Sequence, residues 1–309
     1  MAHDTGVAAD MIGVDDAALR AWPLPMPSDH GDKETRGRVV IVAGSREIPG
    51  AAVLAATAAL RAGAGKVAIG APASIAGALA FAVPESRIVA LEESDAGGIA
   101  AGAAAALAEL AEGATSLLVG PGLPYDASTC DLTVALLETY SKARIVLDAG
   151  AMRVVRPPTH AREARMRFTS PVLLTPHAGE MASLSGNDKG SITSRPRAVA
   201  LDAARQWNAV VALKGPITHI AAPDARVWRH DGGNVGLATS GSGDVLAGII
   251  AGLLARGASL EQAGVWGVAL HARAGERLAR RFGEIGYLAR ELAAEVPALM
   301  TMLATAAEA

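Results

Sequence analysis

The stretch NVGLATSGSGDVLAGIIAGLLARG, residues 234–257, joins a glycine-rich turn directly to an apolar segment. Apolar residues in that segment recur at the i, i+4, i+8 spacing of one helical face, and Gly257 suits a helix end. The turn Gly241–Asp244 is therefore predicted to stand at the N-terminus of an amphipathic helix. There, unpaired backbone N–H groups and the helix dipole favour an anion, and glycines let the backbone approach it closely.

Asp244, the last residue of this turn, allows two interpretations. An aspartate in the first turn of a helix can simply cap that helix. Alternatively, the N–H groups hold a phosphate while the Asp244 carboxylate deprotonates the hydroxyl that receives it. A positioned general base contributes ~10²–10⁴ in rate, and fixed dipoles around the developing charge contribute further. We favour this second interpretation, which predicts a phosphoryl-handling enzyme.

Two familiar phosphate-binding loops do not fit the spacing of the glycines. In a Walker A loop a Lys-Ser/Thr pair follows the second glycine, but Gly44 and Gly50 lie one residue too far apart and two alanines follow. A dinucleotide-binding GxGxxG motif starting at Gly241 requires glycine at position 246, which is leucine. The turn is neither a P-loop nor a Rossmann fingerprint.

Short apolar runs, rich in β-branched residues, alternate with Ala/Leu-rich stretches along most of the chain. Runs that are apolar on both faces are typical of strands covered by helices on each side. The alternation predicts an α/β fold with a doubly wound, mostly parallel sheet flanked by helices. The predicted strands are Arg38–Ala43, Val67–Ile69, Leu117–Val119, Ile145–Leu147, Val172–Leu174 and Val210–Leu213.

Helical composition and capping signals place helices between these strands. The predicted helices are Ala51–Arg61, Ile99–Glu112, Ser128–Ser141, a helix from Ser194-Arg195-Pro196 to Trp207, and one from Ser259 to Arg281, where Gln262 completes a capping box. Two short strands around Pro223-Asp224, within residues 218–230, predict a small hairpin late in the chain. The proline-punctuated residues 1–35 are expected to form an extended lead-in, and residues 36–309 a single catalytic domain.

Composition excludes several classes of function. The formal charge of −3 gives no electrostatic basis for nucleic-acid binding, and the arginines between 153 and 167 are interpreted as a solvated loop. No run approaches the ~20 apolar residues of a membrane span, and the N-terminus lacks a signal peptide. The single cysteine, Cys130, cannot form an internal disulfide. A cytoplasmic protein that binds no membrane is expected.

Chemically informative segments follow five of the predicted strands directly. In open α/β sheets, ligands bind outside the carboxyl ends of the strands. Five such segments at one edge therefore predict a site there. They are Gly44-Ser45, Gly120-Pro121-Gly122, Asp148, Thr175-Pro176-His177 and Lys214-Gly215.

With these motifs placed, the chain resembles the ADP- or ATP-dependent NAD(P)H-hydrate dehydratases, members of the ribokinase-like superfamily that repair hydrated nicotinamide cofactors. The resemblance covers roughly residues 33 to 295, in family order. The matching segments are 33–45, ending in GRVVIVAGS, 50–65, GPGL at 120–123, LTPHAGE at 174–180, LKGPIT at 213–218, and 234–248. Their combination is far more specific than any one motif.

The resemblance implies a role for each matching residue. Asp244 would activate the substrate hydroxyl. The residues expected to line the hydrated-cofactor pocket are Ala51, Ala52, Gly122 and His177. The residues expected to hold the nucleotide are Lys214, Gly215, Pro216, Ile217 and Thr218, with Gly241, Ser242 and Gly243 at its phosphate end. No residue is assigned as a metal ligand.

The implied reaction phosphorylates the hydroxyl of (6S)-NAD(P)H hydrate and then expels phosphate, which restores NAD(P)H. Phosphate is a far better leaving group than hydroxide, and the ring nitrogen can supply electrons to its departure. The implied partners are NAD(P)H hydrate and ADP, or ATP, with Mg²⁺ as the accompanying ion. Homo-oligomers are frequent in the family. Residues 1–35 cannot hold the epimerase domain of many relatives, so pairing with a separate NAD(P)H-hydrate epimerase is expected.

The chain departs from the family pattern in a few places. Gly150 stands where the family carries a second aspartate after Asp148, Ser242 replaces a commoner threonine, and Ala178 a usual proline. Two rival functions therefore stay open. One is a ribokinase-like kinase of a vitamin precursor, of the hydroxyethylthiazole or hydroxymethylpyrimidine type. The other is a catalytically silent nucleotide-binding protein, which the absent acid at Gly150 favours.

The remaining reactive side chains are interpreted as structural. His219, His230 and His271 have no partner signature and are expected to be packed or on the surface. Cys130 is expected to be a small packed residue near a helix start.

Overall fold

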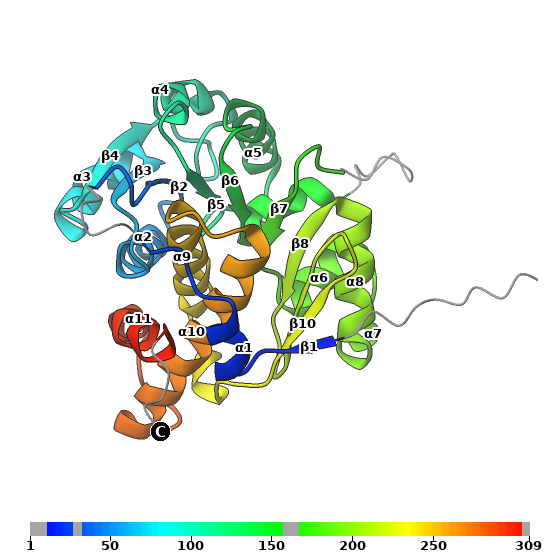
Figure 1. The fold of residues 1–309 in the computed structure, drawn as a ribbon. Helices are drawn as coiled ribbons and strands as arrows, with labels where there is room; N and C mark the ends of the chain where they lie inside the picture. The colour runs from blue at the N-terminus through cyan, green and yellow to red at the C-terminus, as the bar shows by residue number, and fades with distance from the viewer. Residues whose placement is uncertain (1–10, 27–32, 157–166, 305–309) are drawn as a thin grey trace, which may run out of the picture.

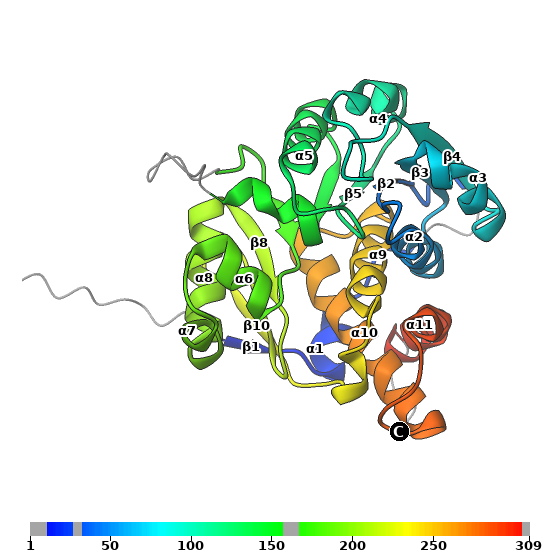
Figure 2. The same cartoon turned by 180° about the vertical axis from the view of Figure 1, so that it is seen from behind.

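The computed structural model describes residues 11–26, 33–156 and 167–304, and its strands form one ten-stranded sheet with helices on both faces (Figures 1 and 2). The strand order is β1-β10-β9-β8-β7-β6-β5-β2-β3-β4. The strands are β1 (Met11–Gly13), β2 (Arg38–Val42), β3 (Lys66–Pro72), β4 (Ser86–Leu91), β5 (Ser116–Val119), β6 (Arg144–Leu147), β7 (Val172–Leu174), β8 (Ala209–Leu213), β9 (Thr218–Ala221) and β10 (Val227–His230).

All neighbouring strands are parallel except at β9, which pairs antiparallel with both β8 and β10. The predicted late hairpin is thus β9–β10, with Ala221 opposite Val227. All six strands predicted from the apolar runs are present. The sequence reasoning missed β4, because this edge strand is half-exposed and lacks the continuous buried pattern of the others.

Two hydrophobic cores lie on opposite faces of the sheet, because successive strand residues point to opposite sides. The helices are α1 (Asp16–Ala21), α2 (Gly50–Arg61), α3 (Ala73–Ala82), α4 (Ala108–Ala111), α5 (Ala127–Thr139), α6 (Ala178–Ser185), α7 (Lys189–Ser194), α8 (Pro196–Trp207), α9 (Ser242–Ala255), α10 (Leu260–Phe282) and α11 (Ala289–Ala304), with 3₁₀ turns η1 (Ala101–Leu107), η2 (Ala149–Val155) and η3 (Val235–Leu237). In β2, Val39 and Ile41 join the core under α2, α9, α10 and α11, whereas Val40 and Val42 join the core under α5 and α8.

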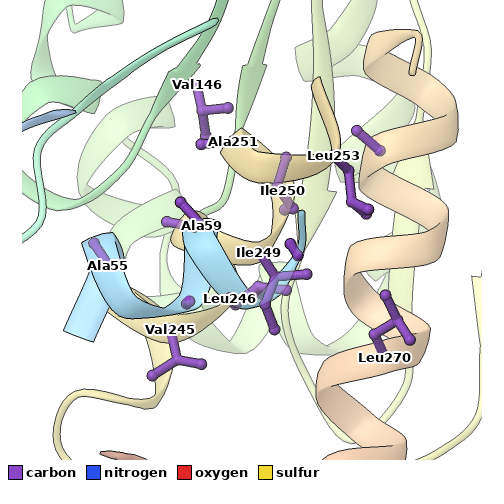
Figure 3. Close-up of a cluster of buried hydrophobic side chains, with 14 of the residues drawn as sticks. Ala55, Ala59, Val146, Val245, Leu246, Ile249, Ile250, Ala251, Leu253 and Leu270 are labelled. Carbon is purple, nitrogen blue, oxygen red and sulfur yellow. The ribbon is translucent and has the colours of Figure 1, made fainter. Parts of the chain in front are cut away.

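Helix α9, which follows the glycine-rich turn, is buried all round rather than amphipathic as predicted. From Val245 to Ala255 every residue is buried. Figure 3 shows its apolar side chains next to Ala55 and Ala59 of α2 and Leu270 of α10. A Cβ placed on Gly248 would lie 2.2 Å from the carbonyl oxygen of Ala55, so small residues let α2 and α9 approach closely. The polar face that an amphipathic helix requires is absent, because this helix lies between the sheet and other helices.

The N-terminal segment also differs from the prediction. Residues 11–22 contain strand β1 and helix α1 and do not form an extended lead-in. Strand β1 adds to the sheet beside β10, and Asp15 caps α1 by accepting the N–H of Ala18 at 2.8 Å. Leu19 is buried, and the carbonyl of Trp22 accepts a hydrogen bond from the Trp266 indole at 2.8 Å. The prolines that suggested an extended chain follow this folded part. Residues 1–10 and 27–32 of the lead-in lie outside the described residues.

Helix boundaries differ from the sequence prediction in two places. The stretch expected as one helix over Ile99–Glu112 is the 3₁₀ turn η1 followed by the single turn α4. A separate helix, α7, ends at Ser194, so Arg195 rather than Ser194 precedes α8, although Pro196 does take its first position. Of the arginines interpreted as a solvated loop, Arg153 lies in η2 and donates to the Tyr125 carbonyl, and Arg167 donates to the Arg205 carbonyl. Those within 157–166 lie outside the described residues. Among the described helices, none is long and apolar enough to cross a membrane.

Candidate active site

The turns that follow β2, β5, β6, β7 and β8 meet at one edge of the sheet, as predicted. Gly44 donates its N–H to the carbonyl of Pro121 at 2.8 Å. The Thr175 hydroxyl donates to a carboxylate oxygen of Asp148 at 2.6 Å. The N–H of Lys214 donates to the carbonyl of Pro176 at 2.8 Å, so hydrogen bonds tie neighbouring turns to one another.

The turn after β5 packs against the start of α2. A Cβ on Gly122 would lie 2.7 Å from the Ala51 Cβ and 2.8 Å from the Ile48 carbonyl oxygen, so only glycine fits. Ala51 and Ala52 are themselves buried, at the first turn of α2. Three of the residues expected to line the substrate pocket are therefore close together. Both alanines are 2% exposed or less, so any contribution to a substrate pocket would come through their small size.

Lys214 lies between two carboxylates at the centre of this edge. Its Nζ is 3.7 Å from Asp148 Oδ1 and 3.9 Å from Glu180 Oε2. Burial raises the pKa of Asp148, and the Lys214 ammonium partly offsets this effect. Glu180 also accepts the Tyr125 hydroxyl at 2.9 Å. Sequence reasoning assigned no role to Glu180 or Tyr125, and it left Asp148 unassigned because of Gly150.

His177 caps helix α6. Its Nδ1 accepts the N–H groups of Gly179 at 3.0 Å and Glu180 at 3.2 Å, and the Glu180 carboxylate accepts the His177 N–H at 2.8 Å. Because Nδ1 is an acceptor here, Nε2 carries the ring hydrogen. The His177 side chain is 58% exposed, and its Nε2 lies 3.6 Å from a Glu180 carboxylate oxygen, so the ring is held by the cap while much of its surface stays open to a ligand. Capping and ligand contact are therefore compatible for this residue.

Asp244 lies in the first turn of α9 and faces the same charged group. Burial, with smaller contributions from Asp148 and Glu180, raises its pKa to about 7, against the opposing effect of Lys214. A Cβ placed on Gly243 would lie 3.4 Å from the Lys214 Nζ, so the ammonium is next to the glycine-rich turn. A carboxyl group with a pKa near neutrality is suited to general-base catalysis. The interpretation of Asp244 as only a helix cap does not explain this environment.

The glycine-rich turn leaves the N-terminus of α9 open. Gly241 has a φ of +87°, which glycine adopts readily, and no side chain of the described residues caps the helix. The Ser242 N–H already donates to the Thr239 carbonyl at 3.3 Å, so within the described residues the N–H groups of Gly243 and Asp244 are the first-turn amides that keep the capacity to bind an anion. The glycine-rich turn and the Lys214 ammonium together form a binding position for an anion, and the Asp244 carboxylate lies beside it as a potential base.

Gly150 is enclosed by the loop after β5. A Cβ at this position would lie 2.5 Å from the Pro124 carbonyl oxygen and 2.7 Å from that of Leu123. Because both neighbours are backbone atoms, any side chain here would displace the loop. The absence of an acidic side chain at position 150 therefore allows the loop that carries Tyr125 to approach the backbone closely. Within the described residues, no three His, Cys, Asp or Glu side chains are grouped to hold a metal.

A profile of the NAD(P)H-hydrate dehydratase family matches residues 39–298, a span that includes every turn of this site. The chain belongs to the NAD(P)H-hydrate dehydratase family. It is 45% identical over 287 residues to the ADP-dependent (S)-NAD(P)H-hydrate dehydratase of Xanthomonas campestris, covering 93% of this chain and 95% of that one. The resemblance identified from the sequence is confirmed.

Solved structures confirm the ribokinase-like fold. The ADP/ATP-dependent NAD(P)H-hydrate dehydratase of Bacillus subtilis, co-crystallised with ATP/Mg²⁺, has a TM-score of 0.80 and 28% identity, covering 95% of this chain and 99% of that one. A ribokinase-like superfamily protein of Enterococcus faecalis has a TM-score of 0.79 and 27% identity, covering 95% and 96%. Family membership favours the dehydratase interpretation over the two rival functions.

Proposed function

We propose that this chain is an ADP-dependent dehydratase, also able to use ATP, that converts (6S)-NAD(P)H hydrate back to NAD(P)H. The observation that carries the proposal is Asp244, a carboxyl group with a pKa of about 7 beside an open helix N-terminus and the Lys214 ammonium. Its family and its 45% identical relative support the same substrate and nucleotide.

In the proposed mechanism, the ionised Asp244 accepts the proton of the substrate hydroxyl. The hydroxyl oxygen then attacks the terminal phosphoryl group of ADP, whose bond to AMP breaks. The first-turn amides of α9 and the Lys214 ammonium stabilise the charge on the transferred group. Phosphate next leaves the ring carbon, assisted by the ring nitrogen, and loss of a proton from the adjacent carbon restores the double bond. The products are NAD(P)H, AMP and phosphate.

The residues present fit the Mg²⁺ that the family implies. Magnesium prefers oxygen ligands and is usually held by one or two carboxylates together with substrate phosphates. Asp148 and Glu180 supply two carboxylates around Lys214 and are the residues that would hold it. When bound, the ion neutralises phosphate charge.

The deciding assay incubates the pure chain with hydrated NADH and either ADP or ATP and follows NADH absorbance. We expect recovery of NADH that depends on nucleotide. No recovery with either nucleotide would contradict the proposal. A vitamin-precursor kinase would instead accumulate a phosphorylated product of its own substrate, and a silent protein would bind nucleotide without turnover. The assembled charges of Asp148, Glu180, Lys214 and Asp244 weigh against the silent protein.

The pKa of Asp244 sets an expected pH dependence. Its ionised form is the base, so kcat/KM for the hydrate should rise with pH up to about pH 7 and level off above it. Activity should fall towards acid pH because protonation removes the base, and burial places this fall near pH 7 rather than near the ordinary aspartate pKa of 3.8. The measurement is kcat/KM from pH 5.5 to 9 in constant ionic strength. A flat profile across pH 6 to 8 would exclude Asp244 as the titrating base.

Several finer expectations stay predictions. They are the preference for ADP over ATP, the homo-oligomer, the cytoplasmic location, the separate epimerase partner and the single catalytic domain over residues 36–309. The site roles also stay predictions: Asp244 as the base, Ala51, Ala52, Gly122 and His177 towards the substrate, and Lys214, Gly215, Pro216, Ile217, Thr218, Gly241, Ser242 and Gly243 towards the nucleotide.

A further inference from the structure

His271, on helix α10, contacts the glycine-rich turn directly. Its Nε2 lies 2.9 Å from the Ser242 hydroxyl oxygen and 3.0 Å from the Ser242 carbonyl oxygen. No sequence motif indicated a partner for His271, which lies 29 residues after Ser242 along the chain. A partly buried imidazole is thus hydrogen-bonded to the residue between the two glycines of the turn.

The geometry fixes where the hydrogens lie. A carbonyl oxygen can only accept, so the contact with the Ser242 carbonyl requires that His271 Nε2 carry the ring hydrogen. Burial lowers the pKa of His271 to about 4, so the imidazole is neutral at physiological pH and keeps this one tautomer. The same N–H also points to the Ser242 hydroxyl oxygen. That hydroxyl is therefore an acceptor towards His271, and its own hydrogen is left to be donated elsewhere.

The packing of α10 holds His271 firmly in place. Gly267, His271 and Gly275 recur every four residues and share one face of the helix. A Cβ on Gly267 would lie 2.5 Å from Ile250 of α9, and one on Gly275 would lie 2.7 Å from Leu237 of η3. Close contacts one turn before and one turn after the imidazole thus fix its position relative to the turn.

We infer that His271 is a positioning residue that fixes Ser242 so that its hydroxyl donates a hydrogen bond to the phosphoryl group held at the turn. The inference rests on the proposed function in one respect, namely that the turn binds a nucleotide phosphate. A serine hydroxyl that rotates freely must be fixed in one orientation when the phosphoryl group binds, and the entropy lost in doing so weakens the binding. Fixing it in advance removes that cost and aligns the phosphoryl group with Asp244, two residues further on.

The test is a double-mutant cycle read on ADP affinity and on kcat/KM. His271→Leu and Ser242→Ala should each weaken ADP binding and lower kcat/KM by about 10- to 100-fold, as expected for a hydrogen bond to a charged group. The double variant should lose little more than either single one, because both changes remove one interaction. His271→Gln, which can still donate an N–H, should recover most of the loss. Binding of adenosine, which has no phosphate, should stay within about twofold.

Control variants and readouts separate positioning from a general structural effect. His230 is a buried histidine that is also bonded to a backbone carbonyl, that of Val14, so His230→Gln is the matched control and should leave ADP affinity unchanged. Losses that add in the double variant, or equal weakening of ADP and adenosine, would overturn the inference. If His271→Leu does not fold, near-wild-type ADP affinity in Ser242→Ala would overturn it equally. If the wild type binds ADP without dehydrating the hydrate, the proposed function fails while the cycle on ADP affinity still decides the role of His271.

Discussion

Replacing Asp244 by asparagine is expected to lower kcat by ~10²–10⁴, the contribution of a positioned general base. Asparagine keeps the shape of the side chain but cannot accept the substrate proton. The amides at the N-terminus of α9 and Lys214 are unchanged, so ADP affinity should stay within about threefold of wild type. The measurement is kcat with saturating hydrate and ADP, together with ADP binding by calorimetry. A rate near that of wild type would refute the base assignment even if the chain is a dehydratase.

The same substitution should stabilise the fold at neutral and alkaline pH. The pKa of Asp244 is raised from 3.8 to about 7 in the folded chain, so the folded state binds this proton more tightly than the unfolded state does. Stability is therefore lost as pH rises from about 4 to 7, and the loss is complete above the folded pKa. A shift of this size corresponds to about 4 kcal/mol at most, because one pKa unit is about 1.4 kcal/mol.

Thermal unfolding at pH 5 and pH 8 checks this stability effect. Asp244→Asn should raise the unfolding temperature at pH 8 by several degrees and change it much less at pH 5. Asp188→Asn is the control, because Asp188 caps α7 on the surface and asparagine caps a helix equally well. It should change neither activity nor the difference in unfolding temperature between pH 5 and pH 8, because the Ser191 hydroxyl and N–H lower the pKa of Asp188 and this carboxylate is ionised at both pH values. A drop in the stability of Asp244→Asn at pH 8 would mean that the carboxylate is satisfied by contacts other than those described.

The sequence predicts the sheet and its functional edge because both depend on local patterns. Buried parallel strands appear as apolar runs, and the residue after each run lies at the carboxyl edge whatever the details of packing. The contacts that complete the site are not local. Tyr125 reaches Glu180 across 55 residues and His271 reaches Ser242 across 29, and no spacing rule relates them. Strand β1 escaped prediction for the same reason, because it pairs with β10 more than 200 residues away.

Gly150 illustrates how the structure changes the meaning of a sequence difference. From the sequence, glycine in place of an acid suggests a lost catalytic group. The structure instead places the carbonyl oxygens of Leu123 and Pro124 against this position, with Tyr125 next along the same loop bonded to Glu180. The loop occupies the space that a side chain would need. The difference therefore concerns the shape of the site, while the charged residues around Lys214 are kept.

Replacing Gly120 by alanine is expected to destabilise the chain by about 4 kcal/mol or more, the range of exceptional single substitutions. Gly120 directly follows β5 and has a φ of +129°, a region that is close to exclusive to glycine. A Cβ there would lie 1.8 Å from the carbonyl oxygen of Asp148 and 3.1 Å from its backbone nitrogen. To relieve this clash, the end of β6 must move away from β5. This movement would also carry Asp148 away from Lys214. Soluble expression and denaturant unfolding should both show a severe loss.

Gly77, in the middle of α3, is the matched control for this substitution. A Cβ there meets no atom within 4 Å and its φ is negative, so Gly77→Ala should be neutral or stabilise by up to about 1 kcal/mol. The contrast separates the effect of the Gly120 backbone from any general cost of adding a methyl group. If Gly120→Ala unfolds at wild-type denaturant concentrations, the ends of β5 and β6 can separate freely. The position of Asp148 beside Lys214 would then not be fixed by the sheet.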